Sequence, residues 1–362
     1  MLDKSKLLKE IEKIKDSIFF DTSDQLVTAG QIWDKILHDD NFQSVVKDAN
    51  VPWIMPSWQG NINIACKAED ISNYRVVSVD GSQIYSDRHY GTLCFLINIG
   101  IVELNYSQIS NVKLNSLPFI FSESVNEISS DLVDFKRQEF ELKYGLEAMT
   151  NAPDKNRALL LFDGSLIFWH LESKSNLVGQ EYLGKYLGLL HQFYKNDLLV
   201  AWYVSLPKSK ELVNLLRFKL LQEMRDVNSI DHLVDTQIAN FFLAPFEYST
   251  IFENHSLISQ SYPSHLKPYF FYFNVGWEIV RIEIPQWIAL HKEKFDTLIS
   301  IIKDQCIKGA GYPVALAEAH EQAVVKGADR DFFYEFLFKL SIDQKHKFYS
   351  SQKSYKKKHV SV

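Results

Sequence analysis

The sequence predicts an α/β protein in which a mixed sheet carries helices on its faces. Apolar runs rich in β-branched residues alternate with stretches of helical period along the 362-residue chain. Aromatic residues make up 14% of the chain, which is typical of a thick, mixed interior. The chain is 46% hydrophobic and 23% charged, so wholesale disorder is excluded. Its length suits two domains or one elaborated domain.

The first 60 residues are predicted to form helices. Leu7, Leu8, Ile11, Ile14 and Ile18 recur at helical spacing with lysines and glutamates between them, which gives an amphipathic stripe. Two prolines in VPWIMPSW then break the pattern.

Strands begin at Arg75. RVVSVDGSQ is predicted to be a short strand that ends in Asp-Gly-Ser, and the apolar run GTLCFLINIGIVEL is predicted to be a second strand. Residues 123–150 return to helical spacing, and Glu139 stands at the position that completes their apolar stripe. ALLLFDGSLIFWH, over 158–170, is continuously apolar and is therefore predicted to be a central strand.

The rest of the chain continues this alternation. A helix is predicted around 179–195, a buried strand at 198–207 and a helix over 208–224. YFFYFNVGWEIVRIEIP is predicted to form two strands joined near 274–276, and the chain beyond Trp287 is predicted to be mostly helical. The expected architecture is a mixed sheet flanked by helices, with helical additions at both ends.

Charge is unevenly distributed along the chain. The formal net charge is −6, but residues 343–362 hold six lysines and one aspartate, so this tail carries +5 and the rest carries −11. The net charge argues against a simple nucleic-acid binder, while the tail is either a solvated end or a contact for phosphate or an acidic partner. Arg281 and Glu283 alternate with apolar residues on a strand, which suggests a cross-strand ion pair.

No membrane segment is expected. No apolar run approaches the ~18–20 residues of a span, and the start MLDKSKLLKE lacks the apolar core of a signal peptide. Three scattered cysteines match neither a disulfide framework nor a zinc site. We expect a soluble, cytoplasmic protein.

A strand followed by Asp-Gly-Ser occurs twice, as VSVDGSQI around Asp80 and as LLFDGSLI around Asp163. In each copy an apolar strand places an aspartate where open α/β sheets hold their sites, and the glycine lets a ligand approach the backbone. Asp-Gly between apolar runs is also a common hairpin signal. The repetition favours two functional carboxylates over two hairpins.

Two aspartates on neighbouring strands would repel each other, and a divalent cation relieves that repulsion. Carboxylate oxygens select Mg²⁺ or Mn²⁺, ions that serve phosphodiester hydrolysis. The helix at 123–150 offers a third carboxylate. Glu139 interrupts the apolar stripe and is expected to face the sheet, whereas Glu141 lies on another side, with Gly145, where small residues permit close packing.

His320 stands in GYPVALAEAHEQAVVKG, on a helix face with Leu316 and Ala323. Tyr312 precedes this helix, about 12 Å from His320 along the axis, so both can line one cleft. Such a histidine is either a core residue that bonds a carbonyl or a proton carrier or phosphate ligand near a metal.

Five blocks of the chain carry a resemblance to a known family. In order they are VDGSQIYSDRH, LLLFDGSLIFWH, YVSLPKS, FYFNVGWEIVRIEIPQW and GYPVALAEAHEQAV. Together they resemble the NurA family of DNA-repair nucleases, over roughly 70% of the chain. The resemblance suggests a helical N-terminal region over 1–70, a nuclease domain over 71–342 and the basic tail over 343–362.

The resemblance implies a ribonuclease H-like core and Mn²⁺- or Mg²⁺-dependent cleavage of DNA, as a 5′→3′ exonuclease and single-strand endonuclease. It also implies a homodimer that works with HerA, a hexameric ATPase translocase, in end resection at double-strand breaks. Asp80 and Asp163 match the aspartates of the family's first two motifs. Tyr312 and His320 match the tyrosine and histidine of its C-terminal motif.

The family's Arg-then-Glu helix pattern fits Arg137 and Glu141 best. The expected metal ligands are therefore the two motif aspartates and Glu141, with Glu139, favoured by the apolar stripe, as the alternative. The histidine is expected to protonate the leaving 3′-oxygen or to orient the scissile phosphate, and the tyrosine to position the strand.

Two other functions remain open from the sequence. One is a catalytically silent subunit that clamps DNA and docks on a motor ATPase. The other is a glycoside hydrolase, whose carboxylate pair would work without metal. Sensitivity to EDTA separates the latter from a metal-dependent nuclease.

Overall fold

The computed structural model describes residues 2–18, 21–86, 94–107, 110–122, 129–150, 157–169 and 177–343. The chain forms two compact units, each assembled from several segments. The first comprises Met1–Lys67, Val204–Gln260 and Tyr269–Ile282, and the second comprises Ala68–Tyr203, Ser261–Pro268 and Glu283–Val362. The predicted basic tail beyond residue 343 lies outside the described residues.

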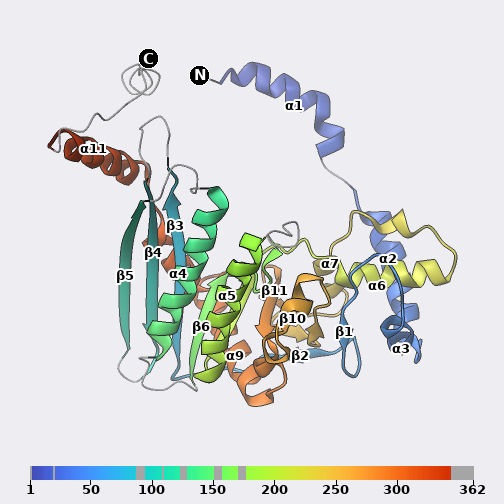
Figure 1. The fold of residues 1–362 in the computed structure, drawn as a ribbon. Helices are drawn as coiled ribbons and strands as arrows, with labels where there is room; N and C mark the ends of the chain where they lie inside the picture. Colours follow the sequence, from blue (N-terminus) through green and yellow to red (C-terminus); the bar gives the residue numbers. More distant parts are fainter. Residues whose placement is uncertain are drawn as a thin grey trace. The chain divides into compact units, whose positions relative to one another are not determined.

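A mixed sheet forms the centre of the second unit (Figure 1). Its strands, in the order β7-β6-β3-β4-β5, are β3 (Arg75–Ile84), β4 (Cys94–Asn105), β5 (Asn111–Ser122), β6 (Ala158–Asp163) and β7 (Leu199–Val204). β6 pairs parallel with both β3 and β7, whereas β3, β4 and β5 form an antiparallel ladder. The sequence did not indicate β5, because most of its residues are exposed and no continuous apolar run marks it.

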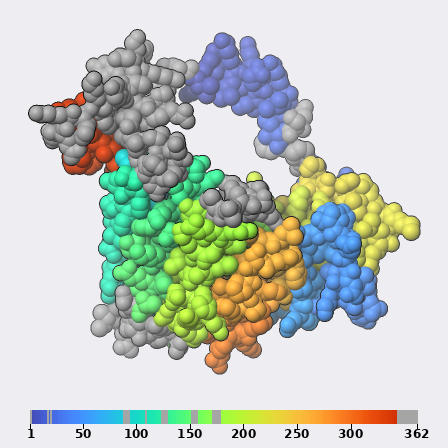
Figure 2. Space-filling model, in the orientation of Figure 1, coloured from blue at the N-terminus to red at the C-terminus, as the bar shows by residue number. Residues whose placement is uncertain are grey.

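Helices cover both faces of this sheet. α4 (Ser130–Thr150) packs on β3 and β4, and α5 (Leu177–Lys195) packs beside it; their green surface is visible in Figure 2. α10 (Val314–Ala323) packs on the opposite face of the sheet. Successive side chains of β3 point to opposite faces and therefore meet different helices. Ser82 contacts Ala323 of α10, while its neighbour Gly81 lies against Arg137 of α4.

The Asp-Gly-Ser sequences do not form hairpins. β3 does not end there as predicted but continues through Asp80 to Ile84, because every residue from 75 to 84 pairs with β4. β6 ends at Asp163, well short of the predicted residue 170, and its neighbours on both sides run parallel to it. The chain turns at Gly164, whose φ of 97° lies in the left-handed region that favours glycine.

The first unit combines helices with short strands. Its elements are α1 (Lys4–Ile18), α2 (Ser23–Leu37), α3 (Phe42–Lys47), β1 (Ser57–Trp58), β2 (Ala65–Lys67), α6 (Glu211–Gln222), α7 (Asp235–Ala239), β8 (Glu247–Ser249), β9 (Phe252–Glu253) and most of β10 (Pro268–Asn274). A buried apolar cluster joins α2, α6 and β10. The predicted N-terminal helices are confirmed, but residues 57–58 and 65–67 form strands because they pair with β9 and β8.

The chain passes from the first unit to the second within β11 (Ile279–Pro285). It continues as α8 (Gln286–Ala289), α9 (Lys292–Lys308), α10 and α11 (Gly327–Asp343), which confirms the predicted helical C-terminal part. In the described part of the chain, 3₁₀ helices span Val227–Ile230, Ile258–Ser261 and Ser264–Leu266. Across the described ranges, no helix has both the length and the apolar character needed to cross a membrane.

Candidate active site

The two motif aspartates lie on adjacent parallel strands in the same register. β3 pairs with β6 at Ser78 and Leu161, an offset of 83 residues, and the same offset relates Asp80 to Asp163. The hydroxyl of Ser78 donates to the carbonyl of Leu161 at 2.9 Å and fixes this register. Both aspartates therefore stand at one end of the parallel ladder, as the repeated sequence predicted.

Glu141 reaches the aspartates from α4 because Gly81 has no side chain. A Cβ on Gly81 would lie 2.6 Å from Oε1 of Glu141 and 2.6 Å from Cγ of Arg137. Arg137 anchors the helix here, since its Nη1 donates to the carbonyl of Gly81 at 3.2 Å and its Nε lies 3.6 Å from Glu141 Oε1. The close approach of α4 to β3 thus depends on a glycine next to Asp80.

Glu139 lies on a different side of α4. Its carboxylate is 3.3 Å from Nζ of Lys136, and it lines a small pocket with Tyr182 and Lys185 of α5. The apolar stripe to which Glu139 belongs faces α5, where Phe135 stacks on Tyr182 at 4.3 Å. The structure therefore brings Glu141, and not Glu139, next to the two aspartates.

His320 is held against Asp80 by the packing of α10. Nδ1 of His320 lies 3.0 Å from Oδ2 of Asp80, and the imidazole is 65% exposed. α10 approaches β4 closely at Gly100, where a Cβ would lie 2.5 Å from the carbonyl of Ala319 and 2.5 Å from the backbone nitrogen of Ala323. The carboxylate orients one ring nitrogen and leaves the other for proton transfer or phosphate contact.

Side chains of the sheet also fix the end of α10. Ser82 and Asn98 donate hydrogen bonds to the carbonyl of Ala323, and Asn98 also donates to the carbonyl of Gln322 at 3.2 Å. Ser116 of β5 donates to the amide oxygen of Asn98 at 3.0 Å. These bonds satisfy carbonyls at the helix end that lack partners within the helix.

Tyr312 contacts the second aspartate. Its hydroxyl hydrogen-bonds to Asp163, and its ring packs edge-on against Tyr203 with centroids 5.5 Å apart. The tight turn before α10 places it there, because a Cβ on Gly309 would collide with the carbonyl of Tyr312 at 1.9 Å. Each residue of the C-terminal pair thus contacts one of the two aspartates.

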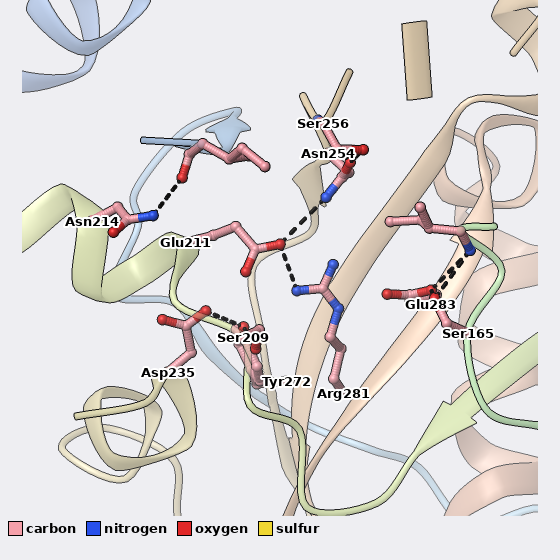
Figure 3. A network of polar contacts seen from close by, with 12 residues as sticks. Ser165, Ser209, Glu211, Asn214, Asp235, Asn254, Ser256, Tyr272, Arg281 and Glu283 are labelled. Carbon is pink, nitrogen blue, oxygen red and sulfur yellow. Dashed lines mark hydrogen bonds and ion pairs between the residues drawn. The ribbon is translucent and has the colours of Figure 1, made fainter. Parts of the chain in front are cut away.

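A buried glutamate supports the loop that follows Asp163. Glu283 accepts hydrogen bonds from the hydroxyl of Ser165 at 2.6 Å and from the backbone nitrogen of Leu166 at 2.9 Å (Figure 3). Arg281 forms an ion pair as suggested, but its partner at 2.8 Å is Glu211 of α6, on a helix and not on a neighbouring strand. Sequence reasoning missed this support, because nothing local links residue 283 to residue 165.

The carboxylates perturb one another electrostatically. Burial, together with the negative charges of Asp80 and Asp163, raises the pKa of Glu141 to about 8, although Arg137 opposes the shift. Burial and the charge of Asp80 also raise the pKa of Asp163, while the hydrogen bond from Tyr312 lowers it. The three side chains therefore share one electrostatic environment and repel one another when ionised.

This donor set fits a divalent cation chemically. Carboxylate oxygens are the ligands that Mg²⁺ and Mn²⁺ prefer, and a cation would relieve the repulsion that, after burial, contributes to the raised pKa of Glu141. Within the described part of the chain, no three His, Cys, Asp or Glu side chains already stand close enough to enclose a metal. Binding would therefore require the carboxylates to draw together and Arg137 to release Glu141.

A family model for the NurA domain matches residues 74–325. The chain belongs to the NurA domain family. The matched range includes all the sequence-predicted site residues, namely Asp80, Glu139, Glu141, Asp163, Tyr312 and His320. Membership in NurA supports a nuclease activity for this chain.

One solved structure supports the same fold. The crystal structure of the NurA nuclease from Sulfolobus solfataricus is 13% identical and has a TM-score of 0.55, with 95% of this chain and 98% of that chain covered. A second NurA crystal structure is 13% identical and has a TM-score of 0.43, with 85% of this chain and 96% of that chain covered. A crystal structure of NurA with manganese is 11% identical and has a TM-score of 0.39, with 90% of this chain and 96% of that chain covered. The search of curated proteins found no relative of this chain. The predicted mixed sheet with flanking helices is confirmed.

Proposed function

We propose that this NurA protein is a metal-dependent deoxyribonuclease. The observation that carries the proposal is the convergence of Asp80, Asp163 and Glu141, where burial, together with the charges of the two aspartates, raises the pKa of Glu141 to about 8. Carboxylates left in mutual repulsion cost stability, and a site that keeps them together is suited to a cation. Membership in a nuclease family supports nucleic acid as the substrate class.

In this proposal Asp80, Asp163 and Glu141 hold one or two Mn²⁺ or Mg²⁺ ions. Such ions supply an activated water and stabilise charge on a phosphodiester undergoing in-line attack. His320, oriented by Asp80, protonates the leaving 3′-oxygen or orients the scissile phosphate. Tyr312, whose hydroxyl donates to Asp163, positions the strand.

The finer assignments rest on the family resemblance. They are 5′→3′ exonuclease and single-strand endonuclease activity, a homodimer, a HerA-type hexameric ATPase as partner, and a cytoplasmic role in end resection at double-strand breaks. The charge of −11 outside the tail fits this picture in one respect. An acidic body holds DNA weakly, so metal ions, a second copy or a motor partner would be needed to retain the substrate.

Digestion of labelled single- and double-stranded DNA with Mn²⁺ or EDTA tests the proposal. Wild type should degrade DNA with Mn²⁺ only, and Asp80→Asn should lose more than about 1000-fold in rate, because a metal ligand carries several kcal/mol of transition-state stabilisation. The melting temperature of the variant in EDTA should stay close to that of wild type. Full activity of Asp80→Asn would refute the assignment.

A second candidate is a catalytically silent subunit that clamps DNA and docks on a motor ATPase. The contact that favours it is the ion pair between Arg137 and Glu141, in which a cationic side chain already lies beside the proposed metal ligand. This candidate predicts no DNA degradation under any metal condition and no response of the melting temperature to divalent ions.

A further inference from the structure

Polar residues continue from the carboxylate cluster along the interface between β3 and α4. Gly81 lies against Glu141, and two residues further along β3, Gln83 lies 3.3 Å from the carboxylate of Asp134. Tyr85 follows on the same side of the strand and also contacts Asp134. The two elements therefore carry one line of side chains that leads away from the site.

Tyr85 stands at the far end of this line with its hydroxyl fixed. The hydroxyl donates to Oδ1 of Asp134 at 2.6 Å and accepts from Nε2 of Gln83 at 2.9 Å. The backbone carbonyl of Tyr85 accepts a longer hydrogen bond, 3.4 Å, from the hydroxyl of Tyr334. Both the side chain and the backbone of this residue are thus anchored.

The ring of Tyr85 is nevertheless 40% exposed. Burial of its hydroxyl beside Asp134 raises the pKa of Tyr85, so the phenol stays neutral and does not repel phosphate. An anchored, exposed aromatic ring offers a stacking surface and loses little side-chain entropy when a ligand binds. Proteins that bind single-stranded nucleic acid without sequence preference stack nucleobases on such rings.

The spacing to the carboxylates suits a DNA strand. Four residues of β3 separate Gly81 from Tyr85, about 13 Å at 3.3 Å per residue. Seven residues of α4 separate Asp134 from Glu141, about 10 Å at 1.5 Å per residue. At about 3.4 Å per stacked nucleotide, these distances correspond to three or four nucleotides.

We propose that Tyr85 is a strand-positioning residue that stacks on a nucleobase of single-stranded DNA three or four nucleotides from the phosphate at the carboxylate cluster. Asp134 and Gln83 hold the ring for this contact. Because the bases of a duplex are already stacked and paired, the contact favours single strands. The inference deepens the proposed nuclease function and rests on it.

Cleavage of short single-stranded oligonucleotides gives the first test. Tyr85→Leu should raise KM about fivefold to 150-fold, the usual contribution of one base–aromatic stack, with kcat changed far less. Tyr85→Phe retains the ring and should fall between Tyr85→Leu and wild type. Tyr194→Leu is the matched control, since Tyr194 of α5 is 41% exposed and lies outside this line. Equal KM values for Tyr85→Leu and Tyr194→Leu would overturn the inference.

Fluorescence supplies a second test that needs no Tyr85 variant. In an Asp80→Asn background, 2-aminopurine is placed at successive positions of a single-stranded oligonucleotide, because stacking quenches this base analogue. One position, three or four nucleotides from the cleavage point mapped with wild type, should be quenched most. Uniform quenching along the oligonucleotide would contradict the inference.

The two tests separate this inference from the proposed function. If wild type cleaves DNA and Asp80→Asn does not, but Tyr85→Leu matches Tyr194→Leu, only the role of Tyr85 is wrong. If wild type cleaves no DNA with any divalent metal, the proposed function fails and the inference fails with it.

Discussion

Two clusters of carboxylates in the described part of the chain differ in how the protein satisfies them. In the first unit, Glu211 pairs with Arg281 at 2.8 Å, and Asp235 accepts hydrogen bonds from Tyr272 at 2.6 Å and from the backbone of Val213 at 2.9 Å (Figure 3). In the second unit, the charges of Asp80 and Asp163 act on Glu141, and Asp80 contacts the exposed His320.

A raised pKa does not distinguish the two clusters. Burial and the charge of Glu211 raise the pKa of Asp235 to about 7, and burial with two aspartates raises that of Glu141 to about 8. The difference lies in the partners. Protein groups satisfy the first cluster, which is therefore structural, whereas the second cluster brings three acids together beside an exposed imidazole.

Replacing one glutamate by glutamine should affect stability differently in the two clusters. Glu211→Gln leaves Arg281 buried without its ion-pair partner and should reduce the free energy of unfolding by about 3 kcal/mol, the low end for a broken buried pair because Asp235 remains nearby. Glu141→Gln replaces a carboxyl group that is mostly protonated below pH 8, so it should leave stability nearly unchanged. Chemical denaturation of both variants at pH 7.5 without metal checks this. Equal destabilisation would mean that the two clusters are alike.

Displacement of α10 should damage only the second cluster. Gly100→Ala forces α10 away from β4 and carries His320 from Asp80, so nuclease activity should fall about 100-fold, as expected when a catalytic group moves by about 1 Å. Gly188→Ala on α5 is a matched control, since a Cβ there meets nothing within 4 Å. If Gly100→Ala retained full activity, the placement of His320 by this contact would be disproved.

The pH dependence of stability and of Mn²⁺ affinity should also distinguish the two clusters, with a smaller effect than the substitutions above. Each raised pKa means that the folded state holds a proton that the unfolded state releases, so stability falls as pH rises from about 4.5 to 8 for Glu141 and from about 3.8 to 7 for Asp235. A metal must displace the proton on Glu141. Mn²⁺ affinity should therefore rise up to about tenfold per pH unit until about pH 8.

Calorimetric titration with Mn²⁺ between pH 6 and pH 9 measures this dependence. Asp235→Asn should keep the pH slope of Mn²⁺ affinity, whereas Glu141→Gln should bind more weakly and lose the slope. A slope that persists in Glu141→Gln would assign the displaced proton to another group.

The sequence predicted the two aspartates of the site, because the same motif of a strand followed by Asp-Gly-Ser occurs twice. Asp80 and Asp163 follow similar strands, and their common register is a consequence of the parallel pairing of those strands. It did not predict that β3 runs on past Asp80, because pairing with β4 overrides the local turn signal of Asp-Gly. Elements marked by a continuous apolar run, such as β6 and β7, or by helical spacing, such as α5, were correctly predicted, although β6 ends early.

The choice between Glu139 and Glu141 needed tertiary structure. The apolar stripe of α4 faces α5, and the side that meets the sheet is instead marked by small residues, with Gly145 against Leu160 and Gly81 against Glu141. Periodicity alone assigns the most apolar face to the sheet. A glycine within an apolar strand, as at Gly100, was the available signal of close approach.

The response of the melting temperature to Mn²⁺ tests the central claim most directly. At a Mn²⁺ concentration 100 times its Kd, wild type should gain about 2.7 kcal/mol of stability, and Glu211→Gln should gain the same from its lower baseline. Asp163→Ala should gain nothing. If Asp163→Ala is stabilised as much as wild type, or if wild type does not respond, the carboxylate cluster of β3, β6 and α4 is not a metal site.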